Sequence, residues 1–281
     1  MRRFVTAVLG LAIAFITPKL GVAQPTVDGL SSNDPSYINL GEWTQNDTGF
    51  GDHGMLELYG YVNGTNLYVM VVGEVESNFN EFYVFLNSES SSGIPSGTQL
   101  PSGSDSGSPF SGFQPTNDFE TDYGVRLTVD GNGNDAYVSI IDYVDYGGSG
   151  NATDTFLGTI GVDGTKFTVG SGDYSGMEIA YDDTGDLSSH TGVEGWEFAI
   201  PLSAIGASAG EQFELFALYG ADDYISANTL PEIPSQGGTN LESNPDFTTI
   251  SGDQHSSQQV LPVELASFEA QRNGSGATLN W

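Results

Sequence analysis

The stretch that decides the fold is MLELYGYVNGTNLYVMVVGEVESNFNEFYVFL, residues 55–86. It holds three short runs rich in aromatic and β-branched residues, MLELYGYV, NLYVMVV and EFYVFL, a composition typical of β-strands. Asn63-Gly64 lies between the first two runs, and because this dipeptide accepts positive φ angles it predicts a hairpin with a type I′ turn. The segments YVMVV and YVFL are apolar on both faces, which predicts central strands covered on both sides.

Runs of the same kind follow along the chain, separated by Gly, Asn, Asp and Ser. They are Tyr123–Val129, Ala136–Tyr143, Thr155–Val162, Lys166–Val169, Met177–Tyr181, Trp196–Leu202 and Phe213–Tyr219. Helical periodicity is almost absent, and Asp130–Asn134 (DGNGN) offers a second hairpin turn. About ten short strands, with the chain reversing between them, predict an all-β fold. We expect an antiparallel β-sandwich of the jelly-roll or immunoglobulin-like kind with long loops.

Alternation within one run shows which face is buried. Trp196, Phe198 and Ile200 share one face of the run WEFAIPL, and Glu197 and Ala199 share the other. We expect the three large apolar side chains to lie in the core.

Residues 88–116 differ from the strands, because they are rich in Ser, Gly and Pro. Few large apolar residues occur there beyond Phe110 and Phe113. We expect a long surface loop between two strands, with these two rings pinning it to the domain.

The charge balance excludes several functions. The chain has 281 residues and a formal net charge of −31, with 6 Lys or Arg against 37 Asp or Glu and no cysteine. A nucleic-acid-binding protein needs cations to displace the counterions of phosphates, so this class is excluded. An anionic membrane surface would repel the chain, and disulfides and zinc–thiolate sites need cysteine. The acidity fits a halophile's surface as well as a set of cation sites.

Residues 1–23 read as a secretory signal peptide. Arg2-Arg3 forms the positive start, FVTAVLGLAIAFIT is the apolar region, and Gly21-Val22-Ala23 provides small residues before a cleavage site. A membrane anchor is the alternative, but the apolar run is shorter than a span of about 20 residues and is interrupted by a proline and a lysine. We expect an exported protein with no transmembrane span in the mature chain, secreted or on the outer surface of a Gram-negative-type bacterium.

Residues 24–259 are expected to form the β-sandwich domain, and the pattern changes near residue 260. VELASFEA, a polar RNGSG turn and ATLNW predict two strands joined by a hairpin. We expect residues 260–281 to be the truncated start of a second β-rich C-terminal region.

Several segments resemble a secreted β-sandwich family allied to family 9 carbohydrate-binding modules and DOMON-like domains. The similar segments are Val27-Asp28-Gly29 with Tyr37, the paired strands NLYVMVVGEVE and NEFYVFLNS, Asp122-Tyr123, and GWEFAIPLSAIG at residues 195–206. Asn87 departs from the pattern, because many relatives have Asp there. The resemblance implies a non-catalytic module that binds a glycan or mediates adhesion at the cell surface.

The tail LPVELASFEAQRNGSGATLNW, residues 261–281, resembles a segment of exported proteins from Bacteroidetes-like and Rhodothermus-like bacteria. In those proteins it follows the main domain and introduces a β-rich region and then a sorting domain for type IX secretion. The resemblance therefore implies delivery to the cell surface by that secretion machinery.

Aromatic side chains are the usual means of binding sugars, because a flat ring stacks on a pyranose while polar groups bond its hydroxyls. The candidates in loop-like sequence are Trp43, Phe50, Tyr146, Tyr174 and Tyr224, and Trp43 within GEWTQND is the best of them. Glu197 is a further ligand candidate because it matches the family segment. The alternatives for Glu197 are a salt partner at the rim or on the strand face and, because bases are few, a bond to a backbone amide, a metal or water. An aromatic residue in a β-protein is more often part of the core than a binding platform.

Calcium is the metal that the composition favours, because hard cations take six to eight oxygens from carboxylates, amides and carbonyls. Asp130, Asn132, Asn134 and Asp135 carry oxygens in a pattern like the first half of an EF-hand loop. The final Glu of such a loop is absent, so an ordinary hairpin turn is the alternative. Further possible oxygen clusters are Asp182–Asp186 and Asp222-Asp223.

Catalytic motifs are absent from the sequence, which has no Gly-x-Ser-x-Gly elbow before a helix, no His-Glu-x-x-His and no Walker-type loop. The three histidines, His53, His190 and His255, lie in separate polar stretches. We therefore expect no enzymatic activity. The alternatives are a structural spacer with no small ligand, and a hydrolytic or glycoside hydrolase-associated domain in which two carboxylates converge.

Overall fold

The computed structural model describes residues 23–45, 53–101, 119–146, 148, 152–185, 192–221, 224–238, 240–241, 243–252, 254–256, 269–273 and 276–280. Side chains are described up to residue 256. Several residues singled out in the sequence lie outside these ranges, namely residues 1–22 of the expected signal peptide, Phe50, Phe110, Phe113, Asp186, His190 and Asp222-Asp223.

Two six-stranded antiparallel sheets form the domain, which confirms the expected all-β sandwich. Sheet 1 has the order β1 (Ile38–Glu42), β2 (Gly54–Val62), β3 (Asn66–Glu74), β10 (Gly195–Pro201), β9 (Glu178–Tyr181) and β8 (Phe167–Thr168). Sheet 2 has the order β12 (Tyr224–Leu230), β11 (Phe213–Ala221), β4 (Glu81–Ser88), β5 (Tyr123–Val129), β6 (Asp135–Asp142) and β7 (Thr153–Gly161). Short 3₁₀ helices occur at Ser31–Asn33 (η1), Leu202–Ile205 (η3) and Phe247–Thr249 (η4).

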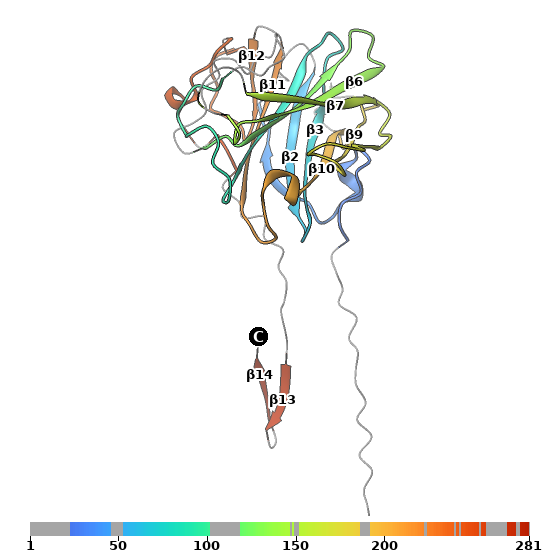
Figure 1. Cartoon of the computed structure of the whole chain (residues 1–281), viewed down its shortest axis with the longest axis vertical. Coiled ribbons are helices and arrows are strands. Elements are labelled where there is room, and N and C mark those ends of the chain that lie inside the picture. Colours follow the sequence, from blue (N-terminus) through green and yellow to red (C-terminus); the bar gives the residue numbers. More distant parts are fainter. Residues whose placement is uncertain are drawn as a thin grey trace, which may run out of the picture.

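The chain passes between the two sheets three times. It leaves sheet 1 after β3, builds β4 to β7 of sheet 2, returns for β8 to β10, and adds β11 and β12 to sheet 2 (Figure 1). This path makes β3 and β10 neighbours at the centre of sheet 1. Within the described residues, no helix is long and apolar enough to cross a membrane.

The tail contains a hairpin, but its bounds differ from the expected ones, because Arg272, Asn273 and Gly276 of the expected turn belong to its strands and residues 263–268 lie outside the described ranges. Strands β13 (Glu269–Asn273) and β14 (Gly276–Asn280) pair antiparallel as a separate two-stranded sheet.

The main core fills the space between the two sheets. Trp196, Phe198 and Ile200 of β10 are all 0% exposed and lie in it, which confirms the burial predicted from alternation. A second apolar cluster covers the other face of sheet 2, where Phe216 packs edge-on against Phe247 of η4. On sheet 1, Met70 and Val72 of β3 are buried with Leu56 on the outer face, so the central strands of both sheets are covered on both sides, as the apolar runs predicted.

The hairpin between β2 and β3 is confirmed, but its predicted turn type is wrong. Neither Asn63 nor Gly64 has a positive φ, which a type I′ turn requires. Instead, Asn63 Oδ1 accepts hydrogen bonds from the N–H groups of Thr65 at 2.8 Å and Asn66 at 2.7 Å. The side chain of Asn63 thus closes the turn in place of its own carbonyl.

The segment expected to be a long loop does connect two strands, β4 and β5. Its first part is tied to the domain by Ile94, which forms a β-bridge with Thr121 and is 6% exposed. Leu100 is also buried against sheet 2. Apolar residues other than the two predicted rings therefore anchor the described part of this segment.

Candidate functional site

A β-bulge on β2 determines which side chains reach the outer face of sheet 1. The register of β2 with β3 shifts between Met55 and Glu57. Met55 and Leu58 both lie in the core between the sheets, and Leu56 and Glu57 therefore both face outward. Bulges re-aim side chains in this way and are common beside functional sites.

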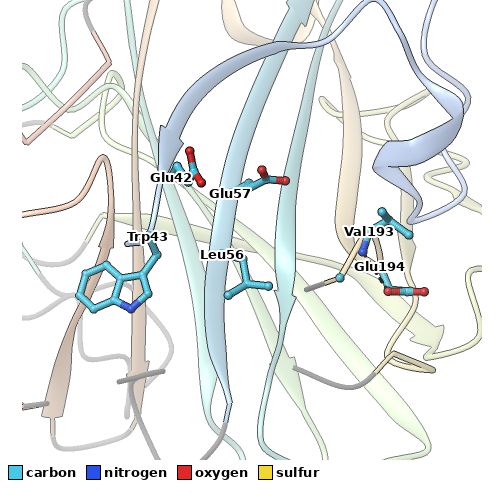
Figure 2. A pocket seen from close by; sticks show the side chains of 7 residues that line it. Glu42, Trp43, Leu56, Glu57, Val193 and Glu194 are labelled. Carbon is cyan, nitrogen blue, oxygen red and sulfur yellow. Dashed lines mark hydrogen bonds between the residues drawn. The ribbon is translucent and has the colours of Figure 1, made fainter. Parts of the chain in front are cut away.

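A cavity of 540 Å³ lies beside this bulge, within the range of about 300–1,000 Å³ that is usual for ligand pockets. We call it the outer groove; it is lined by Glu42, Trp43, Leu56, Glu57, Gly192, Val193 and Glu194. Figure 2 shows the carboxylates of Glu42 and Glu57 close together, with Trp43 to one side and Val193 and Glu194 to the other. Trp43 is held by a 2.8 Å hydrogen bond from its backbone N–H to the carbonyl of Leu56.

Residues 192–194 form one wall of the outer groove and are held by the N-terminal segment. The backbone N–H of Ser31 donates to the carbonyl of Val193 at 2.8 Å, and Leu30 forms a β-bridge with Glu194. The position of this wall therefore depends on how firmly residues 28–31 are fixed to sheet 1.

The outer groove is strongly acidic. Glu42 and Glu57 are direct cross-strand partners, a relation in which like charges repel each other. Glu57 accepts a 2.7 Å hydrogen bond from the hydroxyl of Tyr59. Burial, together with this bond and the charge of Glu57, raises the pKa of Tyr59 to about 12, so the phenol remains a donor at neutral pH. The described lining contains three carboxylates and no lysine or arginine, which favours ligands that donate hydrogen bonds.

Glu197 fixes the N-terminal segment to the outer face of sheet 1. Its side chain points away from the core and is 0% exposed. Glu197 Oε2 accepts hydrogen bonds from the backbone N–H groups of Asp28 at 2.8 Å and Gly29 at 3.0 Å. Glu197 Oε1 accepts the hydroxyl of Tyr37 at 2.6 Å. The residues that carry the family resemblance at Asp28-Gly29 and at Tyr37 thus both bind the carboxylate of Glu197, which lies in the third similar segment, residues 195–206.

The environment of Glu197 favours its neutral form. Burial raises the pKa of Glu197 from 4.5 to about 7, although the three hydrogen-bond donors favour the ionised form. The negative charge of Asp34 acts in the same direction as burial. Burial also raises the pKa of Asp34 itself.

The protein is expected to lose stability as the pH rises through the pKa of Glu197. The folded state binds this proton more tightly, because the pKa is about 7 in the fold against an ordinary value of 4.5. The stability that the folded state gains from binding the proton of Glu197 more tightly is complete below pH 4.5 and is lost as the pH rises through about 7. Between pH 5 and pH 8 without calcium, wild type should lose ~2 kcal/mol relative to Glu197→Gln in urea unfolding. Parallel pH profiles for the two proteins would contradict this role.

The aromatic residues predicted to bind sugar do not form one site. Among the candidates that the structure describes, which leave out Phe50, Trp43 alone lines the outer groove. Tyr146 is half-buried against the cluster on sheet 2, and Tyr224 is 53% exposed at the start of β12. The expectation that Tyr174 offers a face to a sugar is wrong, because this ring is 5% exposed and packs in the core. A turn closed by the N–H of Met177 on the carbonyl of Tyr174 directs the ring inward.

The sequence predicts that Glu197 binds a ligand, with a bond to a backbone amide as an alternative. In the structure Glu197 accepts hydrogen bonds from two backbone amides. It is fully buried beneath the N-terminal segment, so it does not line the outer groove.

The predicted calcium loop has the hydrogen bonds of a hairpin turn. Asp130 Oδ1 accepts the N–H groups of Asn132, Asn134 and Asp135, and Oδ2 accepts the amide of Asn132. These bonds, that of Asn134 above all, lower the pKa of Asp130. The donors that surround this carboxylate come from its own turn, an arrangement that favours the hairpin alternative, and calcium binding here stays a prediction.

Sequence reasoning missed the groove residues Glu42, Glu57 and Glu194. Strict alternation along MLELYGYV would place Glu57 on the same face as Met55, in the core. The bulge that moves Glu57 outward has no glycine at residues 55–57 themselves, although Gly54 precedes it and Gly73 pairs with Met55. The signal in the sequence that could have indicated Glu42 as a groove residue is its position next to Trp43, the best aromatic candidate for sugar binding.

No protein-family model, no curated protein and no solved structure matches this chain. The relation to family 9 carbohydrate-binding modules and DOMON-like domains therefore stays a prediction that rests on short segments.

Proposed function

We propose that the protein is a non-catalytic β-sandwich module that binds a saccharide in the outer groove. The observation that supports this most is the cross-strand pair Glu42 and Glu57 beside the exposed apolar side chain of Val193. Carboxylates accept hydrogen bonds from sugar hydroxyls, and such charge-assisted bonds are stronger than neutral ones. Val193 is 38% exposed and offers an apolar contact for a ring face. Trp43 is 6% exposed, so only a small part of its ring reaches the groove.

The charge of the groove selects the class of saccharide. Three glutamates without a lysine or arginine in the described lining would repel a carboxylate, sulfate or phosphate on the ligand. Hydroxyl and ammonium groups would instead be attracted, because both donate hydrogen bonds. The proposed ligand is therefore a neutral or amine-bearing sugar, and uronic and sulfated glycans are excluded.

The same two carboxylates also suit the hydrolytic alternative. Cross-strand partners have Cβ atoms about 4.5–5.5 Å apart, and a glycosidase needs two carboxyl groups roughly 5–10 Å apart. A glycosidase also needs one carboxyl group kept protonated by burial. Glu42 is exposed, and Glu57 already accepts a hydrogen bond from the hydroxyl of Tyr59, so neither residue has the buried, unengaged carboxyl group that this role needs. Binding is therefore the better proposal, and release of reducing sugar from a bound glycan would overturn it in favour of hydrolysis.

We also propose that the module acts outside the cell, secreted or attached to the outer surface, where it mediates glycan-dependent adhesion. This part rests on the leader-like residues 1–23 and the tail 261–281. A structural spacer would not need an acidic groove of this volume, and it is the function that remains if no glycan binds.

A glycan array tests the proposal. It should include neutral, amino, uronic and sulfated glycans, with the protein applied at neutral pH in the presence of calcium. We expect binding to neutral or amine-bearing glycans and none to the acidic ones. No binding to any glycan, or binding confined to acidic glycans, would contradict the proposal.

A further inference from the structure

Three carboxylates converge beneath the N-terminal segment, apart from the residues that line the outer groove. One oxygen each from Asp28, Asp34 and Glu197 lies within 4.8 Å of the others. Asp28 and Asp34 stand on either side of η1, and Glu197 is on β10. The cluster therefore joins residues far apart in the sequence.

A buried oxygen in this cluster has no hydrogen-bond partner among the residues that the structure describes. Asp34 is 5% exposed, and its Oδ1 accepts the backbone N–H of Thr26 at 2.8 Å. Asp34 Oδ2 is buried and accepts no hydrogen bond from the described residues. Burying a carboxylate oxygen without a hydrogen-bond partner costs free energy, and a proton donor or a cation bound beside it would remove this cost.

The described part of the chain supplies no basic side chain to this cluster. Lys166 and Arg126 are the lysine and arginine whose side chains are described, and both lie beside other acids: Lys166 is 2.7 Å from Glu178 and Arg126 is 3.8 Å from Glu81. Three carboxylates this close repel one another strongly. A proton on one of them removes a single charge, whereas a divalent cation attracts all three.

We propose that Asp28, Asp34 and Glu197 bind a divalent cation, and that calcium is the ion they suit best. Calcium takes six to eight oxygens in flexible geometry, and carboxylates are its usual ligands. Glu197 Oε1 accepts one hydrogen bond and Asp34 Oδ2 none, so both keep lone pairs for a metal. Backbone carbonyls and water would complete the shell. Magnesium demands near-ideal octahedral geometry and suits this cluster less well.

The consequence of binding is local order. Calcium in the cluster would join the segment that contains Asp28 and Asp34 to β10, in addition to the hydrogen bonds that Glu197 already accepts. It binds the folded state and not the unfolded chain, so it should stabilise the protein in a saturable way.

Thermal unfolding after chelator treatment tests this proposal. Calcium chloride at about 100 times its dissociation constant should raise the Tm of wild type by about 5–10 °C. Sodium chloride at matched ionic strength should give a smaller rise without saturation. Asp34→Asn should lose the saturable rise, and it should still fold, because its new amide can donate to the other two carboxylates. Asp130→Asn is the matched control and should keep the rise.

The proposal is overturned if wild type shows no saturable rise, if Asp34→Asn keeps it, or if Asp130→Asn loses it. A crystal structure of wild type grown with calcium gives a readout that needs no variant. Density bonded to Asp28, Asp34 and Glu197 at about 2.3–2.6 Å would support the site. A calcium-containing crystal with no such density there would overturn it.

Discussion

Replacing Glu197 by alanine should destabilise the protein by about 3–5 kcal/mol at neutral pH. The substitution removes the acceptor of three hydrogen bonds, from the backbone N–H groups of Asp28 and Gly29 and from the hydroxyl of Tyr37. Each buried donor left without a partner costs about 1–3 kcal/mol, and relief of the repulsion with Asp34 offsets part of the sum. Urea unfolding at pH 7, with the slope of the transition checked, measures the change.

Glu197→Gln is the matched control for this prediction. Its amide oxygen can accept the two backbone N–H groups, and its NH₂ group can donate to Tyr37 and Asp34. We expect the glutamine variant to be at least as stable as wild type at pH 7 without calcium. If alanine and glutamine have the same effect, the carboxylate does not act through these hydrogen bonds.

The double variant Glu42→Gln with Glu57→Gln should weaken saccharide binding about 100-fold. Two charge-assisted acceptors become neutral, and about 1.4 kcal/mol for each corresponds to one factor of ten in Kd. The folded state should not suffer, because the substitutions remove a like-charge cross-strand pair. The measurement is the Kd of the best glycan from the array, together with the Tm of each protein.

Glu89→Gln is the control for the loss of a surface charge. Glu89 is exposed, follows β4 of sheet 2 and is not part of the groove lining. It should bind the glycan like wild type. An unchanged Kd in the double variant, or an equal loss in Glu89→Gln, would show that the groove carboxylates do not hold the sugar.

The sandwich could be predicted from the sequence because its strands carry clear local patterns. The apolar runs around residues 67–72 and 82–86 marked the central strands, and the alternation in β10 placed Trp196 in the core. These signals depend on neighbours within one strand. Sheet order could not be read in the same way, since β10 lies beside β3 although more than a hundred residues separate them.

The candidate sites were less predictable, because each depends on tertiary structure. The bulge at Leu56 breaks the alternation that would have placed Glu57 inward. Asp34 joins Glu197 only after the N-terminal segment folds over sheet 1. Tyr174 has loop-like neighbours in the sequence, yet its turn directs the ring into the core. Polarity of neighbouring residues is therefore a poor guide to the exposure of an aromatic ring in this chain.

The two sites described here share the N-terminal segment. Glu197 binds the backbone of Asp28 and Gly29, and the next two residues pair with Val193 and Glu194 in the wall of the outer groove. A rigid segment at this point would present the groove in one shape, which lowers the entropy lost when a ligand binds.

The most direct test of the proposed function is a crystal structure of the protein with the best neutral or amine-bearing glycan from the array. We expect the sugar in the outer groove, with its hydroxyl or ammonium groups bonded to Glu42 or Glu57 and a ring face against Val193. A sugar bound elsewhere on the sandwich, with the groove filled by water alone, would contradict the account.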